Sequence, residues 1–254
     1  MPELDFKSPR LFVDSPLGEG QTVALKRDQS NYLGNVLRLG VGDTTLVFNG
    51  RDGEWRASIS GRKRPDSLTI EKRTRPQDRL PDLAYIFAPL KHARLDYMVQ
   101  KAVEMGANAL QPVLTRFTQV SRVNGERMRA NVIEAAEQCG ILSLADVRDP
   151  MPLARFLDTR DAQRLLVFCD EAAELADPLA ALKAARTEVD GIDVLIGPEG
   201  GFAEEERAAL LRQSKILRLA LGPRILRADT AAVAALALVG AALGDWAAEA
   251  VKSR

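Results

Sequence analysis

The chain has 254 residues, of which 46% are apolar, and its 35 basic side chains balance 35 acidic ones. This composition excludes a disordered chain, and the zero net charge excludes a global attraction to nucleic acid, so any such binding needs local patches. Two cysteines and one histidine are too few for a structural zinc site, and we expect no metal.

Residues 1–72 contain short strand patterns separated by turn signals. The patterns are LFVD, QTVAL, TTLVFNG, EWRASISG and SLTIEK. Between the second and third of them, DQSNYLGNVLRLGVGD has apolar residues at helical spacing and predicts one short helix. We expect a small β-barrel or sandwich in this region.

The segment 73–82, RTRPQDRLPD, is rich in charge and contains prolines, and we place the linker between two domains there. Beyond it, in residues 83–254, strand patterns alternate with helical ones. The expected strands are LAYIFAPL, ALQPVL, RLLVFCD, IDVLIGP and KILRLAL, and the expected helices are Leu95–Met105, Met128–Cys139, Pro178–Ala185, Glu204–Leu211 and a final apolar helix. This alternation predicts an α/β domain with a mainly parallel sheet.

The final helix, from Thr230 to Leu243, is apolar on all sides. It is too short and too rich in alanine to span a bilayer, so we expect it in a core or an oligomer interface. The first ten residues have no hydrophobic targeting segment. We therefore expect a cytoplasmic protein in which Cys139 and Cys169 are reduced and buried, with no membrane partner.

Two loops at expected strand ends are candidates for a ligand site. The first, VLIGPEGGFAEEE, combines a glycine-rich turn with three glutamates in the first turn of a helix. Glycines let a backbone approach a ligand, but the glutamates disfavour a phosphate there, so a neutral or cationic ligand fits better. The alternative is that GPEGG is only a tight connection.

The second loop, LGPRILR, turns at Gly222-Pro223 and places Arg224 and Arg227 near the start of the apolar helix. Since an unpaired buried charge is costly, we expect these arginines to face a ligand, a backbone phosphate or another subunit. Asp229 has two interpretations, as the N-cap of the helix or as a catalytic residue.

Several motifs in order give the chain a family resemblance. They are VLRLGVGD, KHARLDYMVQKAVEMGANALQPVLTRF, EAAEQCG, IGPEGGF and LGPRILR. With them, nearly the whole chain resembles the small-subunit ribosomal RNA uridine N3-methyltransferases of the SPOUT superfamily of knotted methyltransferases.

The resemblance implies a PUA-like β-barrel for RNA, followed by a carboxyl-terminal α/β domain with a trefoil knot. It implies a homodimer that uses S-adenosyl-L-methionine to methylate N3 of a specific uridine in 16S ribosomal RNA of the small ribosomal subunit. Carried over by position, the cofactor contacts are Gly197, Glu199, Gly201, Leu221, Gly222 and Leu226.

The chain departs from the family pattern at several positions. Asp229 stands where glutamate is usual, Ala203 or Ala228 where a hydroxyl residue is usual, and SNYLGNVLR lacks the paired histidines common before VLR. These differences affect the assignment of the base and the affinity for RNA.

Methylation at N3 requires that the uracil lose its N3 proton. Arg224 and Arg227 are the candidates that stabilise negative charge on the uracil oxygens, and Asp229 or Glu199 is the candidate that accepts the proton. No covalent cysteine adduct is needed. We expect His92 to be a surface residue rather than a catalytic one.

Two groups of basic residues are the candidate RNA contacts, although a charge run is often only a solvated face. One group lies in the first domain and consists of Arg62, Lys63, Arg64 and Lys72; the other lies in the second domain. The candidate contacts are Arg62, Lys63, Arg64, Lys91, Arg94, Arg116, Arg122, Arg127 and Arg129.

Two other functions remain open on the sequence alone. One is a catalytically silent RNA-binding ribosome assembly factor. The other is a knotted methyltransferase that acts on transfer RNA or on the ribose 2′-OH.

Overall fold

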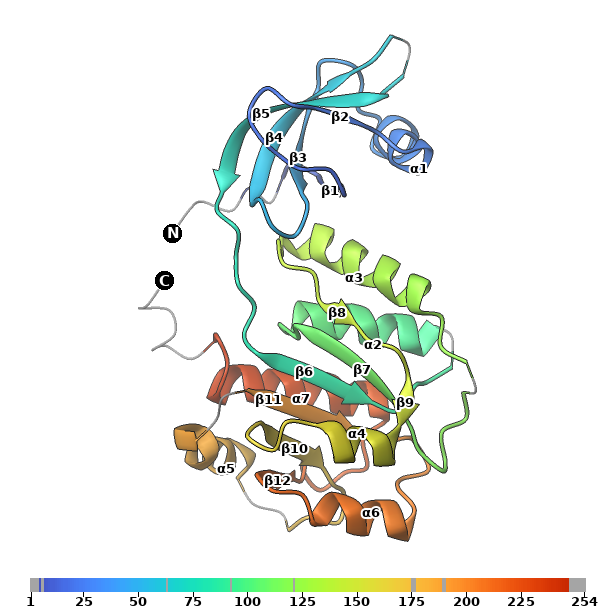
Figure 1. The fold of residues 1–254 in the computed structure, drawn as a ribbon, viewed down its shortest axis with the longest axis vertical. Helices are drawn as coiled ribbons and strands as arrows, with labels where there is room; N and C mark the ends of the chain where they lie inside the picture. The colour runs from blue at the N-terminus through green and yellow to red at the C-terminus, as the bar shows by residue number, and fades with distance from the viewer. Residues whose placement is uncertain are drawn as a thin grey trace. The chain divides into compact units, whose positions relative to one another are not determined.

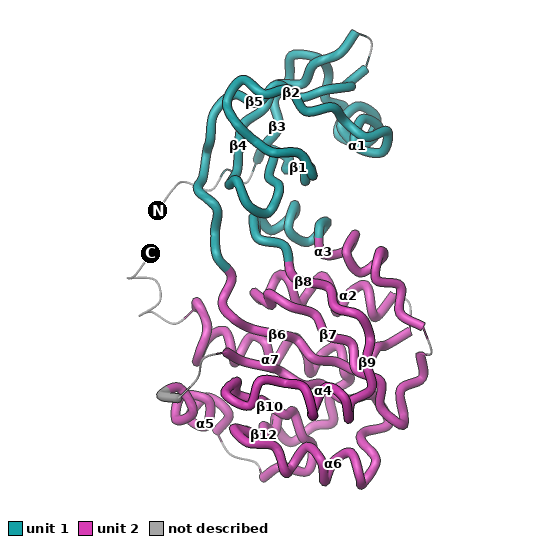
Figure 2. Tube along the Cα trace, in the orientation of Figure 1, with its two compact units in different colours: residues 1–79, 133–144 teal, residues 80–132, 145–254 magenta. Residues whose placement is uncertain are grey.

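The computed structural model describes residues 5, 7–62, 64–91, 93–120, 122–174, 177–188 and 191–246. Lys63 and His92 lie outside the described residues. The chain divides into two compact units: unit 1 comprises residues 1–79 and 133–144, and unit 2 comprises residues 80–132 and 145–254 (Figure 2). Each unit is built around its own sheet.

Unit 1 contains a five-stranded sheet of order β1-β3-β4-β5-β2. Its strands are β1 (Arg10–Phe12), β2 (Thr22–Ala24), β3 (Thr44–Phe48), β4 (Glu54–Ser60) and β5 (Ser67–Arg75). The helix α1 (Arg27–Asn31) continues into a π-helical turn, Tyr32–Val36. The predicted strands and the short helix between them are therefore confirmed.

The core of unit 1 follows from the alternation of apolar residues along its strands. Ala57 and Ile59 on β4 and Leu68 and Ile70 on β5 are buried together with Leu33 of the π-helical turn. Since successive side chains of a strand point to opposite faces, this spacing gives the sheet one apolar face.

A buried ion cluster lies where β1, β4 and β5 meet. Arg10 and Arg75 both bond the carboxylate of Glu54, at 2.9 Å and 2.8 Å, and only 2% of the Glu54 side chain is exposed. Burial by itself raises the pKa of Glu54, but hydrogen bonds from Arg75 and Thr74 outweigh it and hold that pKa below its ordinary value.

Residues 133–144 complete unit 1 from a distant part of the chain (Figure 2). They include the end of α3 (Gly125–Cys139), where Glu137 accepts a hydrogen bond from the Phe12 N–H at 2.8 Å. Arg75 donates to the Gly140 carbonyl, also at 2.8 Å. The apolar side chains of Phe12, Phe48, Ala136 and Leu142 pack together. The sequence pattern holds no sign of this return of the chain.

Unit 2 contains a seven-stranded sheet of order β12-β10-β11-β6-β7-β8, with β9 paired to β7. Every pairing in it is parallel. The strands are β6 (Leu83–Phe87), β7 (Ala109–Leu114), β8 (Asp146–Val147), β9 (Met151–Pro152), β10 (Leu165–Cys169), β11 (Ile192–Ile196) and β12 (Ile216–Leu219). The mainly parallel sheet is confirmed, whereas the short β8 and β9 were not expected.

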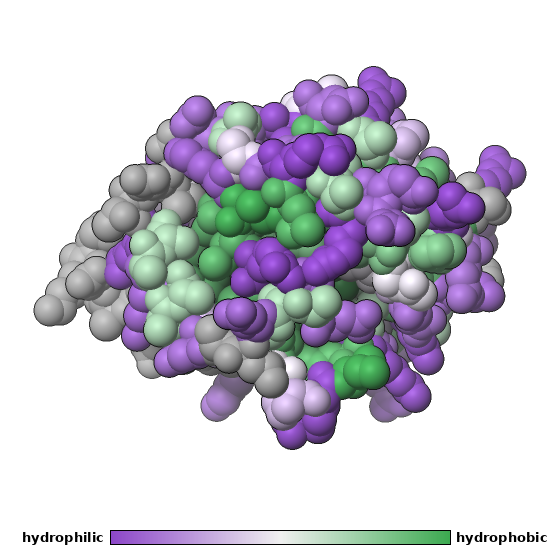
Figure 3. Space-filling model, turned by 90° about the horizontal axis from the view of Figure 1, so that it is seen from below, coloured by the Kyte–Doolittle hydropathy of each residue, from purple (hydrophilic) through white to green (hydrophobic). Residues whose placement is uncertain are grey.

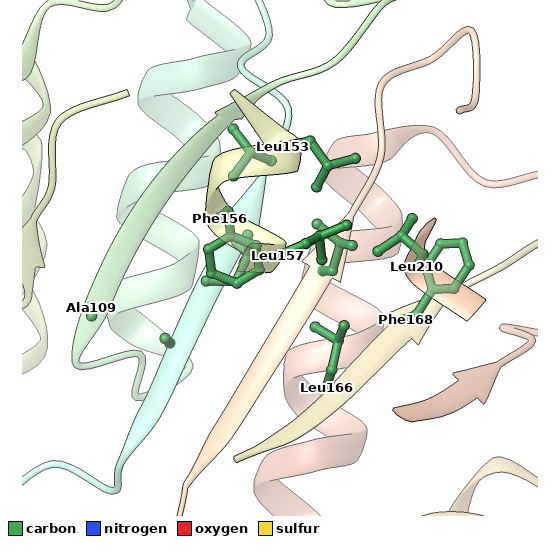
Figure 4. Close-up of a cluster of buried hydrophobic side chains, with 11 residues drawn as sticks. Ala109, Leu153, Phe156, Leu157, Leu166, Phe168 and Leu210 are labelled. Atoms are coloured by element: carbon green, nitrogen blue, oxygen red, sulfur yellow. The ribbon is translucent and has the colours of Figure 1, made fainter. Parts of the chain in front are cut away.

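Helices cover both faces of this sheet (Figure 1). They are α2 (Ala93–Glu104), α4 (Leu153–Thr159), α5 (Pro178–Ala184) with a 3-10 turn Ala185–Glu188, α6 (Glu204–Leu211) and α7 (Ala228–Ala242). On one face, α4 and α6 bury Leu153, Phe156, Leu157 and Leu210 against Leu166 and Phe168 of β10 (Figure 4).

On the other face, α7 packs against α2, α5 and β11. Its residues Ala232, Ala235, Leu236 and Val239 are buried, which confirms the expected place of the apolar helix in a core. The helix α2 also buries an apolar face, which consists of Met98, Val99, Ala102 and Val103. No helix among the described residues has the length and hydropathy needed to cross a membrane.

A buried ion network lies at the amino-terminal ends of the parallel strands, which we call the amino edge of the sheet. Asp193 accepts a hydrogen bond from Arg164 Nε at 2.7 Å, and the Arg164 Nη1 reaches Asp82 at 2.6 Å. Arg160 lies 3.6 Å from the second oxygen of Asp193, and the exposed fractions of these two side chains are 2% and 4%. On β11 this network lies at the opposite end of the strand from the predicted contact Gly197.

Candidate functional site

Both glycine-containing loops lie at the carboxyl ends of the parallel strands, which we call the carboxyl edge of the sheet. Because β11 and β12 run parallel, residues 197–203 and 220–227 follow their carboxyl ends, where α/β proteins bind ligands. The loops are not adjacent in the sheet, since β10 lies between the two strands.

The glycines of the first loop have identifiable structural roles. A Cβ atom added at Gly197 would lie 2.4 Å from the ring of Phe202, and that ring packs edge-on against Phe168 with 5.4 Å between centroids. Gly201 has φ +71°, which favours glycine, and its N–H donates to the Pro198 carbonyl. The alternative of a tight connection therefore accounts for part of this motif.

The first turn of α6 ties two loops together through Glu206. One carboxylate oxygen accepts the Ala203 N–H at 3.0 Å, and the other accepts the Arg116 N–H at 2.8 Å. Arg116 follows β7, so Glu206 joins the loop after β7 to the loop after β11. Glu204 and Glu205 lie in the same turn, and both are exposed.

The second loop exposes backbone and charge. Gly222 has φ +95° with no atom within 4 Å of an added Cβ, and Ile225 is 90% exposed. The main-chain groups of residues 221–226 make no hydrogen bond to another described residue. Arg224 and Arg227 are exposed and form no ion pair within the described part of the chain. Leu221 and Leu226 are half-buried.

Asp229 occupies the second position of α7 rather than the cap. The N-cap is Arg227, and the Asp229 carboxylate accepts the Thr230 N–H at 2.9 Å. The N-cap interpretation of Asp229 is therefore wrong. Burial raises the pKa of Tyr85 on β6 well above its ordinary value, with smaller contributions from Cys169 and Asp229, so the start of α7 lies in electrostatic range of β6.

The two cysteines differ in environment. Cys139 ends α3 and is exposed, so the expectation that it is buried is wrong. Cys169 is partly buried, and the burial of its thiol raises its pKa to about 12. A thiol with so high a pKa is a poor nucleophile at neutral pH.

A cavity of about 420 Å³ lies beside the first loop. Lys91 and Arg94, both candidate RNA contacts, line it together with Glu199. Arg94 forms an ion pair with Glu199, and the exposed fractions of the two side chains are 43% and 42%. The pairing neutralises the carboxylate of Glu199, which is one of the two candidate proton acceptors.

The other candidate RNA contacts of unit 2 divide into paired and unpaired residues. Arg127 Nε donates to Asp96 at 2.9 Å, so its charge is balanced locally. Arg122 and Arg129 are exposed and line a second cavity of about 680 Å³ together with Arg148, which lies in none of the sequence motifs. The side chain of Arg116 is exposed.

In unit 1, Arg62, Arg64 and Lys72 are exposed. No cluster of three or more His, Cys, Asp or Glu with the geometry of a metal site occurs among the residues that the structure describes.

Two regions of the chain match models of known protein families. Residues 77–240 match the family model of the RNA methyltransferase domain, and residues 25–72 match that of the RNA methyltransferase PUA domain. The ribosomal RNA small subunit methyltransferase E of Rickettsia conorii is 30% identical over 92% of this chain and 95% of its own length.

Two solved structures share the fold over nearly their whole length. The ribosomal RNA small subunit methyltransferase E of Neisseria gonorrhoeae, bound to S-adenosyl methionine, has a TM-score of 0.81 and 27% identity over 94% of this chain and 100% of its own. A methyltransferase of Legionella pneumophila with bound SAM has a TM-score of 0.80 and 27% identity, covering 93% of this chain and 98% of its own.

Proposed function

The chain belongs to the ribosomal RNA small subunit methyltransferase E family, and on that premise we propose that it transfers the methyl group of S-adenosylmethionine to N3 of one uridine in 16S ribosomal RNA. The observation that carries the chemistry is the pair Arg224 and Arg227, two exposed arginines without ion-pair partners in the described chain at the carboxyl edge of the parallel sheet.

The loop residues fit the proposed cofactor. Unpaired main-chain N–H and C=O groups at residues 221–226 are available to the polar edge of an adenine, and the open space at Gly222 allows close approach. We assign contacts to Gly197, Glu199, Gly201, Leu221, Gly222 and Leu226. When bound, the cofactor supplies an electrophilic methyl group on a cationic sulfur, which suits a loop whose helix begins with three glutamates.

The residues of the chain then have separate tasks. Arg224 and Arg227 stabilise the negative charge that the uracil oxygens acquire when N3 loses its proton. We assign proton acceptance to Asp229, because Glu199 is neutralised by Arg94 whereas the Asp229 carboxylate accepts one backbone N–H. Glu199 serves with Arg94 to shape the cavity.

The trefoil knot belongs to the proposal and has support in the strand order. β12 lies at one edge of the sheet, yet α7, which follows it, packs against β11 and α2. The chain must therefore return past β10 after the second loop, which is the path that a knot in these loops requires.

The homodimer is also part of the proposal. The face of α7 that its own unit leaves half-buried includes Val233, Ala234 and Leu238. Ile225 stands 90% exposed just before this helix. Apolar surface appears between polar residues on the face of the molecule drawn in Figure 3. Contact with a second copy in the cytoplasm would cover such residues.

Nucleoside mass spectrometry tests the proposed reaction. Small-subunit ribosomal RNA and intact small subunits from a strain lacking the gene are incubated with pure protein, with and without S-adenosylmethionine. We expect 3-methyluridine to form only with the cofactor, and mapping of the product identifies the uridine.

Other products would assign other functions. Binding without any methylated nucleoside would support an assembly factor, and a 2′-O-methylated nucleoside or methylated transfer RNA would place the chain with other substrates. Sedimentation equilibrium tests the homodimer, and a monomer at micromolar concentration would contradict it.

A further inference from the structure

We propose that the 420 Å³ cavity receives the uracil ring of the target uridine, and that the ring stacks on Phe117. This inference rests on the proposed function and names the binding site of its substrate base. Phe117 is the last residue of the motif KHARLDYMVQKAVEMGANALQPVLTRF, but the motif assigns it no role. The volume falls within the range of about 300–1,000 Å³ that is usual for small-molecule sites.

Phe117 is placed for stacking. It lines the cavity, and the residue is 44% exposed although it is large and apolar. Single-stranded nucleotides and bases extruded from a duplex are held by aromatic side chains in this way, because every base offers a flat face.

The turn that carries Phe117 is held in one conformation. The Thr118 N–H donates to the Thr115 carbonyl at 3.1 Å, and the Thr115 N–H donates to the Thr118 hydroxyl at 2.9 Å. Glu206 accepts the Arg116 N–H in the same turn. The backbone that carries the ring is therefore ordered before a base arrives, which lowers the entropic cost of binding.

The same turn contacts the first loop of the site. A Cβ added at Gly200 would lie 3.3 Å from the Cβ of Phe117, so the absence of a side chain there permits the contact. Glu206 also accepts the Ala203 N–H, which fixes the two loops together. A base on Phe117 would thus lie next to the residues of the first loop that are assigned to the cofactor.

The polar lining of the cavity matches the edge of uracil, where two carbonyl oxygens flank N3. Lys91 is an exposed cation with no ion-pair partner in the described chain, and Gln119 offers an amide donor and acceptor. A positive charge beside the carbonyl oxygens favours the uracil anion over the neutral base. The cavity therefore suits a pyrimidine that loses its N3 proton.

Substitutions at Phe117 test the stacking. Steady-state methylation is measured at varied RNA concentration for Phe117→Ala, Phe117→Leu and Phe117→Trp, with Leu211→Ala as the control because Leu211 is equally exposed at 43% but lies outside the cavity. We expect Phe117→Ala to lower kcat/KM for RNA by about 10- to 100-fold and Phe117→Leu by nearly as much. Phe117→Trp and Leu211→Ala should match the wild type.

Two further measurements separate this inference from a folding defect and from the proposed function. Calorimetric affinity for S-adenosylmethionine should be unchanged in Phe117→Ala. An oligonucleotide with 5-iodouridine at the methylated position should crosslink on irradiation to the peptide that contains Phe117.

The outcomes are distinct. If the wild type makes 3-methyluridine but Phe117→Ala is equally active, or if the crosslink maps outside the residues around the cavity, the pocket assignment is overturned and the proposed function stands. If the wild type makes no 3-methyluridine, the proposed function fails and the pocket assignment fails with it.

Discussion

The two edges of the seven-stranded sheet use arginine in opposite ways. At the amino edge, the side chains of Arg160 and Arg164 are only 2% and 18% exposed and are directed at the carboxylate of Asp193. At the carboxyl edge, Arg224 and Arg227 are exposed and have no ion-pair partner among the described residues. The same side chain is thus part of the fold at one edge and available to a ligand at the other.

This difference shows why residue type and local sequence do not identify a functional arginine. A buried guanidinium needs its carboxylate because desolvation of either charge alone is costly. An exposed guanidinium costs little to maintain, and its charge acts on a substrate only when that substrate displaces water. We therefore expect four effects of decreasing size when buried and exposed charges are altered in turn.

Removal of the central carboxylate at the amino edge should have the largest effect. We expect Asp193→Ala to lower the free energy of unfolding by about 3–5 kcal/mol, because the buried Arg160 loses its carboxylate partner and Arg164 keeps only the exposed Asp82. Urea unfolding followed by circular dichroism measures the change. Asp146→Ala, which breaks an exposed pair with Arg148, is the control and should change stability by about 0.5 kcal/mol or less. Equal shifts in the two variants would contradict the structural role.

Substitution at the carboxyl edge should leave stability unchanged and reduce the rate. Arg224→Ala and Arg227→Ala should each lower kcat by about 10²- to 10³-fold, the usual loss when one stabiliser of developing negative charge is removed. Arg212→Ala, an exposed arginine just past the end of α6, is the control. Full activity in both Arg224→Ala and Arg227→Ala would remove these residues from the mechanism.

The stability of unit 1 should depend on pH through Glu137. Burial, with a smaller contribution from Glu134, raises the Glu137 pKa to about 7. The protonated form is therefore favoured in the folded state, and its stabilisation is full below the ordinary pKa and is lost as the pH rises through about 7. After discounting for partial exposure, we expect a loss of about 1–2 kcal/mol between pH 5 and pH 8.

Glu137→Gln separates this contribution from other titrations. Its amide oxygen still accepts the Phe12 N–H but does not titrate, so the pH dependence of the unfolding midpoint should become flatter. An identical pH profile in the variant and the wild type would assign the effect to other groups.

The smallest effect concerns the salt dependence of RNA affinity. Arg122→Ala and Arg129→Ala should each reduce the slope of log affinity against log salt by about 1, as expected for one lost phosphate contact. Arg127→Ala should change the slope less, because Asp96 already balances that charge. Filter binding at several salt concentrations measures the slope for all three variants. A larger change in slope for Arg127→Ala than for the other two would show that Arg127, and not Arg122 or Arg129, contacts the phosphates.

The sequence was sufficient for most elements because their patterns are local. The alternation in EWRASISG and the apolar run IDVLIGP each correspond to a strand, β4 and β11. The α4 helix and the short β8 and β9 strands were missed, since their few residues have little periodicity. Cys139 was expected to be buried from the general behaviour of cysteine, but it is the exposed last residue of α3.

The site was less predictable because it depends on contacts between loops. The loops and their arginines were recognised by family resemblance, whereas the Arg94–Glu199 pair joins residues that are far apart in the sequence. Phe117 is the last residue of a family motif, but the motif gave it no role, because its position depends on the turn with Thr118 and on the missing side chain of Gly200. Such relations appear only when three loops meet.

The discontinuity of unit 1 has a consequence for synthesis on the ribosome. The 65 residues between positions 79 and 144 take about 3 to 13 s to translate at ~5–20 residues per second. During that interval the nascent β-sheet has emerged, but the residues that cover Phe12 and Phe48 have not. The amino-terminal segment, residues 1–79, is therefore a candidate client for a nascent-chain chaperone, which would shield its apolar surface until the second segment arrives.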